Sequence, residues 1–316
     1  MPHKIRRVLR AFASTPWFIE PRMAERIVAL LEYRSTNGPR ADRAVEHRPS
    51  AEGYGPGPSP ASPDRIAIIP MTGIVTPRGL GVADICDIPP AAVSLTSFQT
   101  TFRKLADDPN VEAIVLEWYS PGGMIDLVPE TAAMIRSARR KGRPIISVVN
   151  TLCASAAYWI ASASDEIVVT PSGEVGSIGV YMMHQDISEA LAAAGVKNTF
   201  IKEGPRKVEG NPFEPLDDTA RAALQETVRH YYEMFVADVA KYRGVSKAIV
   251  RADPEAAEQH FGGGRTYPAQ KAVALGMADR VDTLDNVLAG LRSGASAGAA
   301  KPGRRAEMAR RRLAMI

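Results

Sequence analysis

Short apolar runs rich in β-branched residues alternate with longer helical patterns along most of this chain, and no other feature restricts the fold more. Such runs predict strands at Ile66–Ile69, Val111–Leu116 and Pro144–Val149. Further strands are predicted at 166–169, 178–183 and 198–202, and helices at 95–106, 124–141, 154–163 and 185–194. Alternating strands and helices favour parallel pairing, because each helix carries the chain back across the sheet. The pattern predicts an α/β fold with a mainly parallel sheet.

Composition changes divide the chain around this main domain, which we predict at 65–291. A long helix is expected at 217–242, and shorter ones at 246–258, 268–275 and 283–292 close the domain. Residues 1–37 are predicted to be a short helical segment, because Pro21–Tyr33 has apolar residues at helical spacing. Residues 38–64 are rich in Pro and Gly and are expected to be a linker.

The formal net charge of +4 comes largely from a basic tail at 292–316, which we expect to be flexible. Such a tail can attract an acidic partner or can simply be solvated, so it predicts no specific nucleic-acid binding. At 45% hydrophobic residues, the chain has enough apolar side chains for a core that excludes water from a buried site.

The two cysteines, Cys86 and Cys153, have no spacing typical of a disulfide framework or a metal site. We therefore expect a reducing setting, no structural disulfide, no metal and no cofactor. Arg10 interrupts the short apolar run near the N-terminus, so neither a secretory signal nor a membrane span is predicted there.

Two small-residue motifs follow predicted strands, at the sheet edge where sites of α/β proteins gather. Ser120-Pro121-Gly122-Gly123 can turn backbone N–H groups outward to hold an oxyanion, although a plain strand-to-helix turn has the same composition. Ser155 lies within the small-residue segment Cys153–Tyr158 at a predicted helix N-terminus, which suits a nucleophile or, equally, a helix-capping serine. The N–H of Ala156 is a candidate second oxyanion donor.

A general base for Ser155 has several candidates. Lys207 ends the segment Ile201–Lys207 after a Gly-Pro turn, and a buried neutral lysine can activate a serine. Lys202 and Arg206 compete for the role, but arginine stays protonated. His184, at the end of the predicted strand 178–183, is a fourth candidate. No Gly-x-Ser-x-Gly elbow surrounds Ser155, which argues against an α/β-hydrolase.

Taken together, these segments resemble the signal peptide peptidase A (protease IV) family, which shares its fold with Clp protease and the crotonases. The resemblance covers about 65–291. Its motifs here are Ser120–Gly123, Ala154–Ala163, Gly176–Val180, Ile201–Lys207 and Gly264–Ala272. The family often has Gly-Gly where this chain has Ala156-Ala157. The resemblance implies a Clp-protease/crotonase-like fold built from repeated β-β-α units.

The resemblance also implies a mechanism and assigns roles to residues. Ser155 would be the nucleophile and Lys207 the general base, with Ser177 orienting the lysine amine. The N–H groups of Gly123 and Ala156 would form the oxyanion hole. Family members assemble into homo-oligomeric rings with inward-facing sites, so a ring is expected.

The predicted absence of a membrane helix and the single protease domain are typical of the family's phage and prophage branch, the head maturation proteases. The implied partners are protein or peptide substrates: scaffold, portal and capsid proteins. The implied location is the bacterial cytoplasm, within the phage prohead. The alternatives are a cytoplasmic protease that degrades remnant peptides, a crotonase-like acyl-CoA enzyme and a catalytically silent capsid ring.

Overall fold

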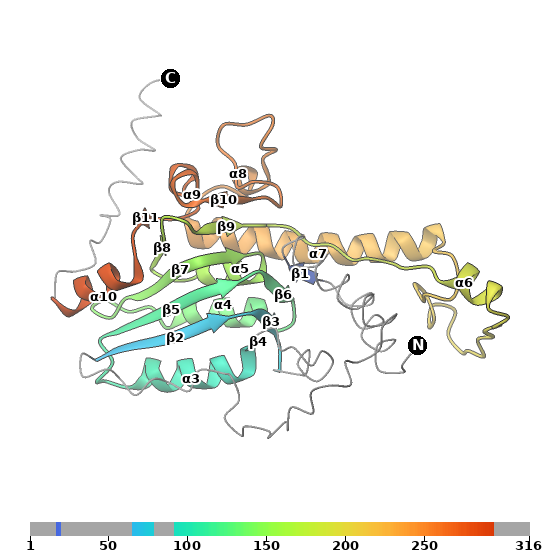
Figure 1. Ribbon diagram of the computed structural model, residues 1–316, viewed down its shortest axis with the longest axis horizontal. Coiled ribbons are helices and arrows are strands. Elements are labelled where there is room, and N and C mark those ends of the chain that lie inside the picture. Colours follow the sequence, from blue (N-terminus) through green and yellow to red (C-terminus); the bar gives the residue numbers. More distant parts are fainter. Residues whose placement is uncertain (1–16, 20–64, 79–91, 294–316) are drawn as a thin grey trace, which may run out of the picture.

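The computed structural model describes the backbone of residues 17–19 and, with side chains, residues 65–78 and 92–293 (Figure 1). Most of the predicted 1–37 and 38–64 segments, Cys86 and the tail beyond Ser293 lie outside these residues. Within 1–37, residues Trp17–Ile19 form a short strand, β1.

The main sheet contains strands β2 (Ile66–Thr72), β5 (Ala113–Ser120), β7 (Ile145–Ala154), β9 (Glu174–Gly176) and β10 (Thr266–Pro268). Its order is β10-β9-β7-β5-β2, and β7 also pairs with β8 (Glu166–Val169), which pairs with β11 (Arg280–Val281). Every pair is parallel except β9 with β10. The prediction of a mainly parallel α/β sheet is confirmed.

A second, smaller sheet lies over the carboxyl ends of these strands. It contains β3 (Ile74–Thr76), β4 (Ala92–Ser94) and β6 (Gly122–Met124), in the order β1-β6-β3-β4. Because β3 follows β2 and β6 follows β5, each long strand continues into a short one before its helix, as a repeated β-β-α unit requires.

Alternate residues of the main strands bury opposite faces of the sheet, as the period of two demands. Ile114 and Leu116 of β5 belong to the larger core, whereas Ala113 and Val115 belong to the smaller one. The larger face is covered by α3 (Leu95–Asp107), α4 (Val128–Ser137), α5 (Ala156–Ser162) and α7 (Asp218–Arg243). The smaller face is covered by α10 (Leu284–Arg292) (Figure 1).

The 26-residue helix α7 is the longest element and has a clear start and stop. Asp217 accepts the Ala220 N–H at 2.7 Å as its N-cap, and Gly244 ends it in a left-handed conformation. The short helices α8 (Lys247–Arg251) and α9 (Ala269–Leu275) follow, and α9 contacts β9 and β11.

After Ile178, which is buried in the larger core, the chain up to residue 217 forms an arm that extends away from the main sheet and includes α6 (Ser188–Ala193) at its outer part (Figure 1). The strands predicted at 178–183 and 198–202 are wrong: neither segment forms a strand in the described structure. The arm is tied to itself instead, by the Ile187 N–H to the Pro212 carbonyl at 2.9 Å and by the packing of Phe200 on Phe213.

Candidate active site

The Ser120–Gly123 motif forms the tight connection from β5 to β6. The Ser120 hydroxyl, fully buried, accepts the Gly122 N–H at 3.2 Å and so fixes the turn. Gly123 then passes so close to β3 that a Cβ atom there would lie 2.0 Å from the Val75 carbonyl oxygen. The glycine is therefore required for the approach of β6 to β3, which holds the backbone of the candidate oxyanion loop in place.

The strand before Ser155 contains an irregularity that re-aims its end. Trp118 pairs with Val149 but the next residue, Tyr119, pairs with Leu152, so β7 accommodates two extra residues there. Bulges of this kind bend a strand and often lie beside active sites. Beyond it, Cys153 pairs with Ser120, which brings the end of β7 alongside the start of the oxyanion loop.

Ser155 occupies a backbone conformation that a serine rarely adopts, with φ 56° and ψ −122°. Its N–H donates to the Gly176 carbonyl at 2.7 Å, and its carbonyl accepts the Trp159 N–H at 2.9 Å. Its side chain makes no capping hydrogen bond, so the expected alternative role as an N-cap through the hydroxyl is not observed. Strained backbone at a non-glycine residue concentrates at functional sites.

Cys153, two residues earlier, is no rival nucleophile. Its side chain is fully buried, and burial raises the pKa of the thiol well above its ordinary value. A protonated, inaccessible thiol is unreactive.

Ser177, directly after β9, shares the positive φ of Ser155. It also has a left-handed φ of 56°, it is 5% exposed, and its N–H donates to the Arg265 carbonyl at 2.8 Å. Gly176, between the two hydrogen bonds, has φ 132° and no room for a Cβ atom, which would lie 2.5 Å from the same Arg265 oxygen. Backbone bonds thus link Ser155, Gly176, Ser177 and Arg265 in one chain of contacts.

The late segment Gly264–Ala272 packs along β9, the strand that bonds to Ser155. Its strand β10 pairs antiparallel with β9, and Thr266 Oγ1 donates to the Glu174 carboxylate at 2.9 Å. The Ala269 N–H donates to the Gly173 carbonyl at 2.9 Å. Because β9 supplies the carbonyl that holds Ser155, this segment supports the nucleophile indirectly.

Helix α5 is anchored by α7. Trp159 stacks on Phe235 with ring centroids 4.7 Å apart, and its Nε1–H donates to Asp238 at 2.9 Å. Burial raises the pKa of Asp238 from its ordinary value, although the Trp159 hydrogen bond partly opposes the shift. The neighbouring Tyr158 hydroxyl donates to the Met277 carbonyl at 2.9 Å. Ser155 therefore sits at the start of a helix with little freedom to move.

The candidate base is not beside Ser155 within one chain. Lys207 lies in the exposed part of the arm, as does Lys202, and neither side chain has a hydrogen bond or ion pair among the described residues. Arg206 is paired with Glu209 at 2.9 Å. The arm that carries Lys207 extends past the sheet (Figure 1), and no hydrogen bond joins Lys207 to Ser155 among the described residues.

His184 makes a structural hydrogen bond in this conformation. Its Nε2 lies 3.0 Å from the Asn211 carbonyl oxygen, which can only accept, so Nε2 carries the proton. This bond joins the outgoing and returning segments of the arm, and no hydrogen bond joins His184 to Ser155 among the described residues.

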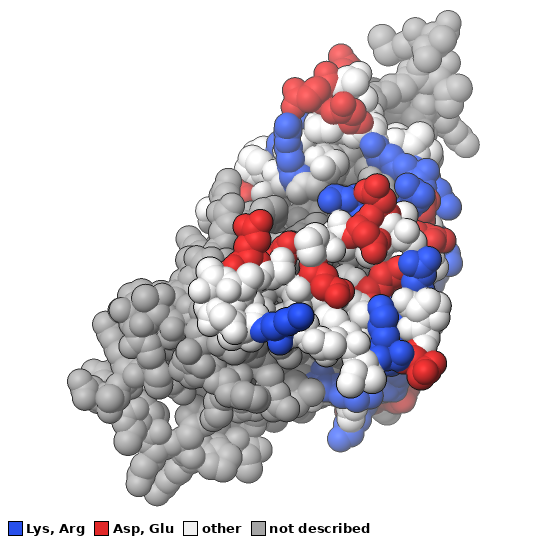
Figure 2. Space-filling view, turned by 90° about the vertical axis from the view of Figure 1, so that its right-hand side faces the viewer, with Lys and Arg blue, Asp and Glu red and all other residues white. Residues whose placement is uncertain are grey.

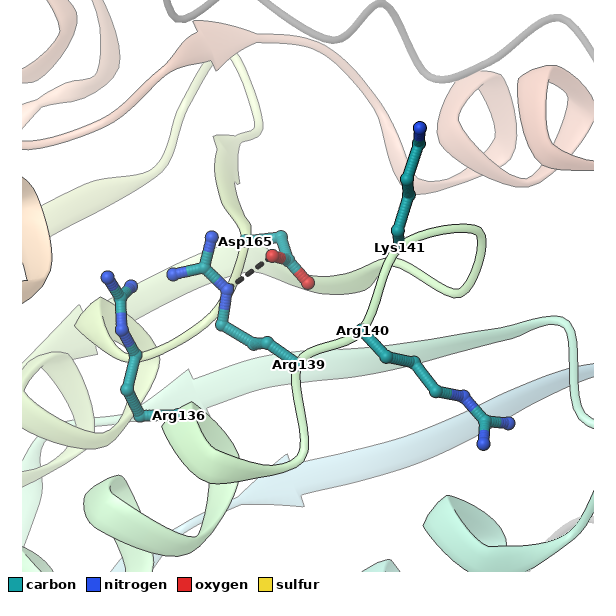
Figure 3. A pocket seen from close by; sticks show the side chains of 5 residues that line it. All are labelled: Arg136, Arg139, Arg140, Lys141 and Asp165. Atoms are coloured by element: carbon teal, nitrogen blue, oxygen red, sulfur yellow. Dashed lines mark hydrogen bonds and ion pairs between the residues drawn. The ribbon is translucent and has the colours of Figure 1, made fainter.

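A shallow surface cavity of about 330 Å³ lies far from these motifs, lined by Arg136, Arg139, Arg140, Lys141 and Asp165 (Figure 3). Arg139 forms an ion pair with Asp165, whose other oxygen accepts the Ile145 N–H at the start of β7. Ser155 follows the other end of this strand, about 30 Å away at 3.3 Å per residue. The cavity is therefore separate from the candidate active site.

In the part of the chain that the structure describes, no group of three His, Cys, Asp or Glu side chains has metal-binding geometry. Across the same residues, no helix combines the length and hydrophobicity needed to cross a bilayer.

Comparison with known proteins decides the family. The model of "Peptidase family S49" matches residues 137–297, about half of the chain, and this stretch contains Ser155, Ser177 and Lys207. The chain belongs to peptidase family S49. The resemblance to the signal peptide peptidase A family is thereby confirmed.

Relatives of this S49 chain include two phage proteins. Capsid assembly protease C of Escherichia phage lambda is 32% identical over 216 residues, which are 68% of this chain and 46% of that protein. Head-tail preconnector protein GP5 of Enterobacteria phage P21 is 30% identical over 68% of this chain and 40% of its own length. A putative signal peptide peptidase SppA of Enterococcus faecium is 30% identical over 60% of this chain and 54% of its own length. The chain thus spans about half the length of these relatives.

Proposed function

We propose that this chain is a serine endopeptidase with Ser155 as its nucleophile. The observation that carries the proposal is the left-handed Ser155 at the bulged end of β7, beside the glycine loop and backed by Gly176. Membership in a peptidase family supports the same chemistry.

In the proposed mechanism, the Ser155 hydroxyl attacks the substrate carbonyl while a neutral lysine amine takes its proton. The oxyanion that forms is held by the N–H groups of Gly123 and Ala156; one such donor contributes about 3–4 kcal/mol to transition-state stabilisation in serine proteases. The protonated amine then gives its proton to the leaving amine, and water hydrolyses the acyl-enzyme with the lysine again acting as base. Ser177 is proposed to orient the lysine amine.

We assign the base to Lys207 and propose that it reaches Ser155 from a second copy of the chain. A lysine acts as a base only in its neutral form, which requires removal from solvent, whereas Lys207 is exposed here. The arm that carries it also exposes Met183, Val196 and Ile201, three of the four large apolar side chains that the described residues expose. A homo-oligomer that covers the arm would bury these side chains and Lys207 together.

The proposed substrates are phage head proteins: scaffold, portal or capsid subunits cleaved within the prohead in the bacterial cytoplasm. The support is the likeness to a protein named capsid assembly protease C and to a head-tail preconnector protein. The rival substrate class, remnant signal peptides, is supported by the likeness to a putative signal peptide peptidase. Incubation of the purified protein with candidate scaffold protein and with a signal peptide decides between them.

The nucleophile is tested by Ser155→Ala, with Ser137→Ala on the outer side of α4 as the matched control. Cleavage of an unstructured protein substrate should fall by at least 10³-fold in Ser155→Ala, with unchanged circular dichroism and oligomer size. Ser137→Ala should cleave normally. Cleavage by Ser155→Ala at the wild-type rate would overturn the proposal.

The base is tested by a set of three single substitutions, Lys207→Ala, Lys202→Ala and His184→Ala. Only Lys207→Ala should abolish cleavage while leaving the oligomer intact. Retained activity in Lys207→Ala, with loss in one of the other two, would move the role to that residue.

A further inference from the structure

The outer edge of β6 is covered by a segment from far away in the sequence. The three residues of β1 pair antiparallel with β6, with Trp17 opposite Met124, Phe18 opposite Gly123 and Ile19 opposite Gly122. More than 100 residues separate the two strands along the chain. On its other edge β6 pairs with β3, through Gly123 and Val75.

This edge belongs to the candidate catalytic loop. Gly122 and Gly123 are the glycines of the oxyanion motif, and α5, which Ser155 begins, contacts β6. A sheet edge offers a row of backbone N–H and C=O groups that an extended peptide can pair with, whatever its sequence. A protease that cleaves unstructured segments of other proteins needs such an edge, because it must hold the substrate backbone extended beside the nucleophile.

The direction of β1 is also that of a bound peptide. From Trp17 to Ile19 the chain runs from Met124 back toward Gly122, which means toward the end of β5. Ser120, at that end, pairs with Cys153, two residues before Ser155. A peptide that pairs with β6 in the same direction leads its following residues toward the nucleophile.

We infer that the outer edge of β6 is the strand on which this protease receives extended substrate, and that Trp17–Ile19 occupies it as an intramolecular competitor. Substrate and β1 exclude one another, so β1 must leave before cleavage. The inference rests on the proposed function for its link to catalysis, but the occupancy itself rests on the backbone pairing alone.

Two further properties fit a removable competitor. Ser155 is only 1% exposed in the chain with β1 in place. A pairing three residues long is weak, because isolated short strand pairs are marginally stable in water and each backbone bond contributes little net free energy. Such a pairing can be displaced by a substrate that extends along more of the edge, or by assembly.

Proline substitution tests the pairing without removing the segment. In an antiparallel pair, adjacent residues alternate between donating to the partner strand and pointing away. One of Phe18→Pro and Ile19→Pro therefore removes an N–H that bonds to β6. The matched controls are Phe18→Ala and Ile19→Ala, which keep both N–H groups.

Amide hydrogen exchange at residues 122–124 should be faster in at least one proline variant than in its alanine control. The same variant should show a KM for an extended peptide substrate lower by roughly tenfold, with kcat unchanged, because it no longer competes with β1. A synthetic peptide spanning residues 13–23 should inhibit this variant competitively.

Faster exchange with an unchanged KM would overturn the inference, because β1 would then be only a structural strand. Unchanged exchange in both proline variants would overturn it as well. If no variant cleaves, and the proposed function fails, substrate-peptide binding read by protection of amides 122–124 still decides. Tighter binding to the proline variant than to its alanine control supports the competitor, and equal binding contradicts it.

Discussion

At the scale of single residues, Gly123 is the position in the candidate site with the least room for a side chain, because its backbone lies against β3. An added Cβ atom would lie 2.0 Å from the Val75 oxygen and 2.6 Å from its nitrogen, and both are backbone atoms that cannot rotate away. We expect Gly123→Ala to displace β6 and to lower kcat/KM by about 10²-fold or more, because a misplaced oxyanion donor costs that much.

The control for this prediction is Gly179→Ala, where the added atom would lie 3.6 Å from the Gly264 Cα atom, an ordinary contact. This variant should retain near-normal peptide cleavage. Steady-state kinetics with one peptide substrate compares the two variants. Full activity in Gly123→Ala would show that the loop backbone has no part in catalysis.

Residue chemistry was partly visible in the sequence. The small residues around Ser155 and the glycines at 122 and 123 indicated close backbone approaches, and the structure has them. The left-handed conformations of Ser155 and Ser177 could not be predicted, because local preference opposes them at non-glycine residues. Each is held by a backbone hydrogen bond to a residue outside its own segment: Ser155 bonds to Gly176 of β9, and Ser177 bonds to Arg265.

At the scale of elements, the contact between α5 and α7 has a pH dependence. Burial raises the pKa of Asp238, so the folded protein binds this proton more tightly than the unfolded chain does. The ionised carboxylate therefore costs stability, a cost absent below the unfolded pKa of about 4 and complete above the raised folded pKa.

Asp238→Asn removes this titration but keeps an oxygen that accepts the Trp159 Nε1–H. The variant should gain melting temperature over the wild type as pH rises from about 4 to 8, with the smallest difference at the acid end. Thermal denaturation across this range measures it. A difference that shrinks as pH rises would contradict the assigned sign.

The end of α7 is held by a buried ion pair between Arg243 and Asp279, which precedes β11. The Arg243 side chain is 2% exposed and makes two bonds to the carboxylate, at 2.9 and 3.1 Å, and two to the Gly276 carbonyl. Burial alone would lower the pKa of Arg243, but Asp279 reverses this and raises it. The guanidinium therefore stays charged in the core.

Asp279→Ala leaves that charge without its carboxylate partner and should lower the free energy of unfolding by about 3–5 kcal/mol. The matched control is Glu255→Ala, which removes the exposed ion pair with Arg265 and should change the free energy of unfolding far less, because solvent screens such a pair. Urea denaturation measures both. Equal effects would mean that burial of the Arg243 pair contributes nothing.

Elements with a strong pattern were predicted closely. The helix expected at 95–106 is α3, Leu95–Asp107, and the one expected at 217–242 is α7, Asp218–Arg243. The strands β3, β6 and β9 were missed because three residues are too few to show the alternation of apolar and polar side chains that indicates a strand. The segments 178–183 and 198–202 have the composition of strands. They form none, because a strand also needs a neighbouring strand to pair with, and composition does not predict one.

At the scale of the whole molecule, the arm is the part whose large apolar side chains are least covered by the rest of the chain. Ile201 is fully exposed, and Val196 and Met183 also face solvent. Figure 2 views the end of the molecule where the arm lies, and there positive and negative side chains are interspersed with uncharged surface. A mixed surface of this kind can pair with a copy of itself, since each sign finds the other across a symmetric contact.

The shared-site proposal predicts complementation between two inactive variants. Ser155→Ala keeps Lys207, and Lys207→Ala keeps Ser155, so each lacks the half of the dyad that the other supplies. When the two proteins are mixed in equal amounts, unfolded and reassembled together, about a quarter of the sites in a ring should pair an intact serine with an intact lysine. Cleavage should therefore recover to about a quarter of the wild-type rate.

Each variant reassembled alone is the control and should stay inactive, and size-exclusion chromatography confirms that all samples form the same oligomer. A double variant, Ser155→Ala with Lys207→Ala, mixed with wild type gives the reference for dilution. If the dyad forms within one chain, every subunit in the mixture of single variants lacks one partner, and no activity returns. Recovery therefore separates a site completed between copies from one completed by movement of the chain's own arm.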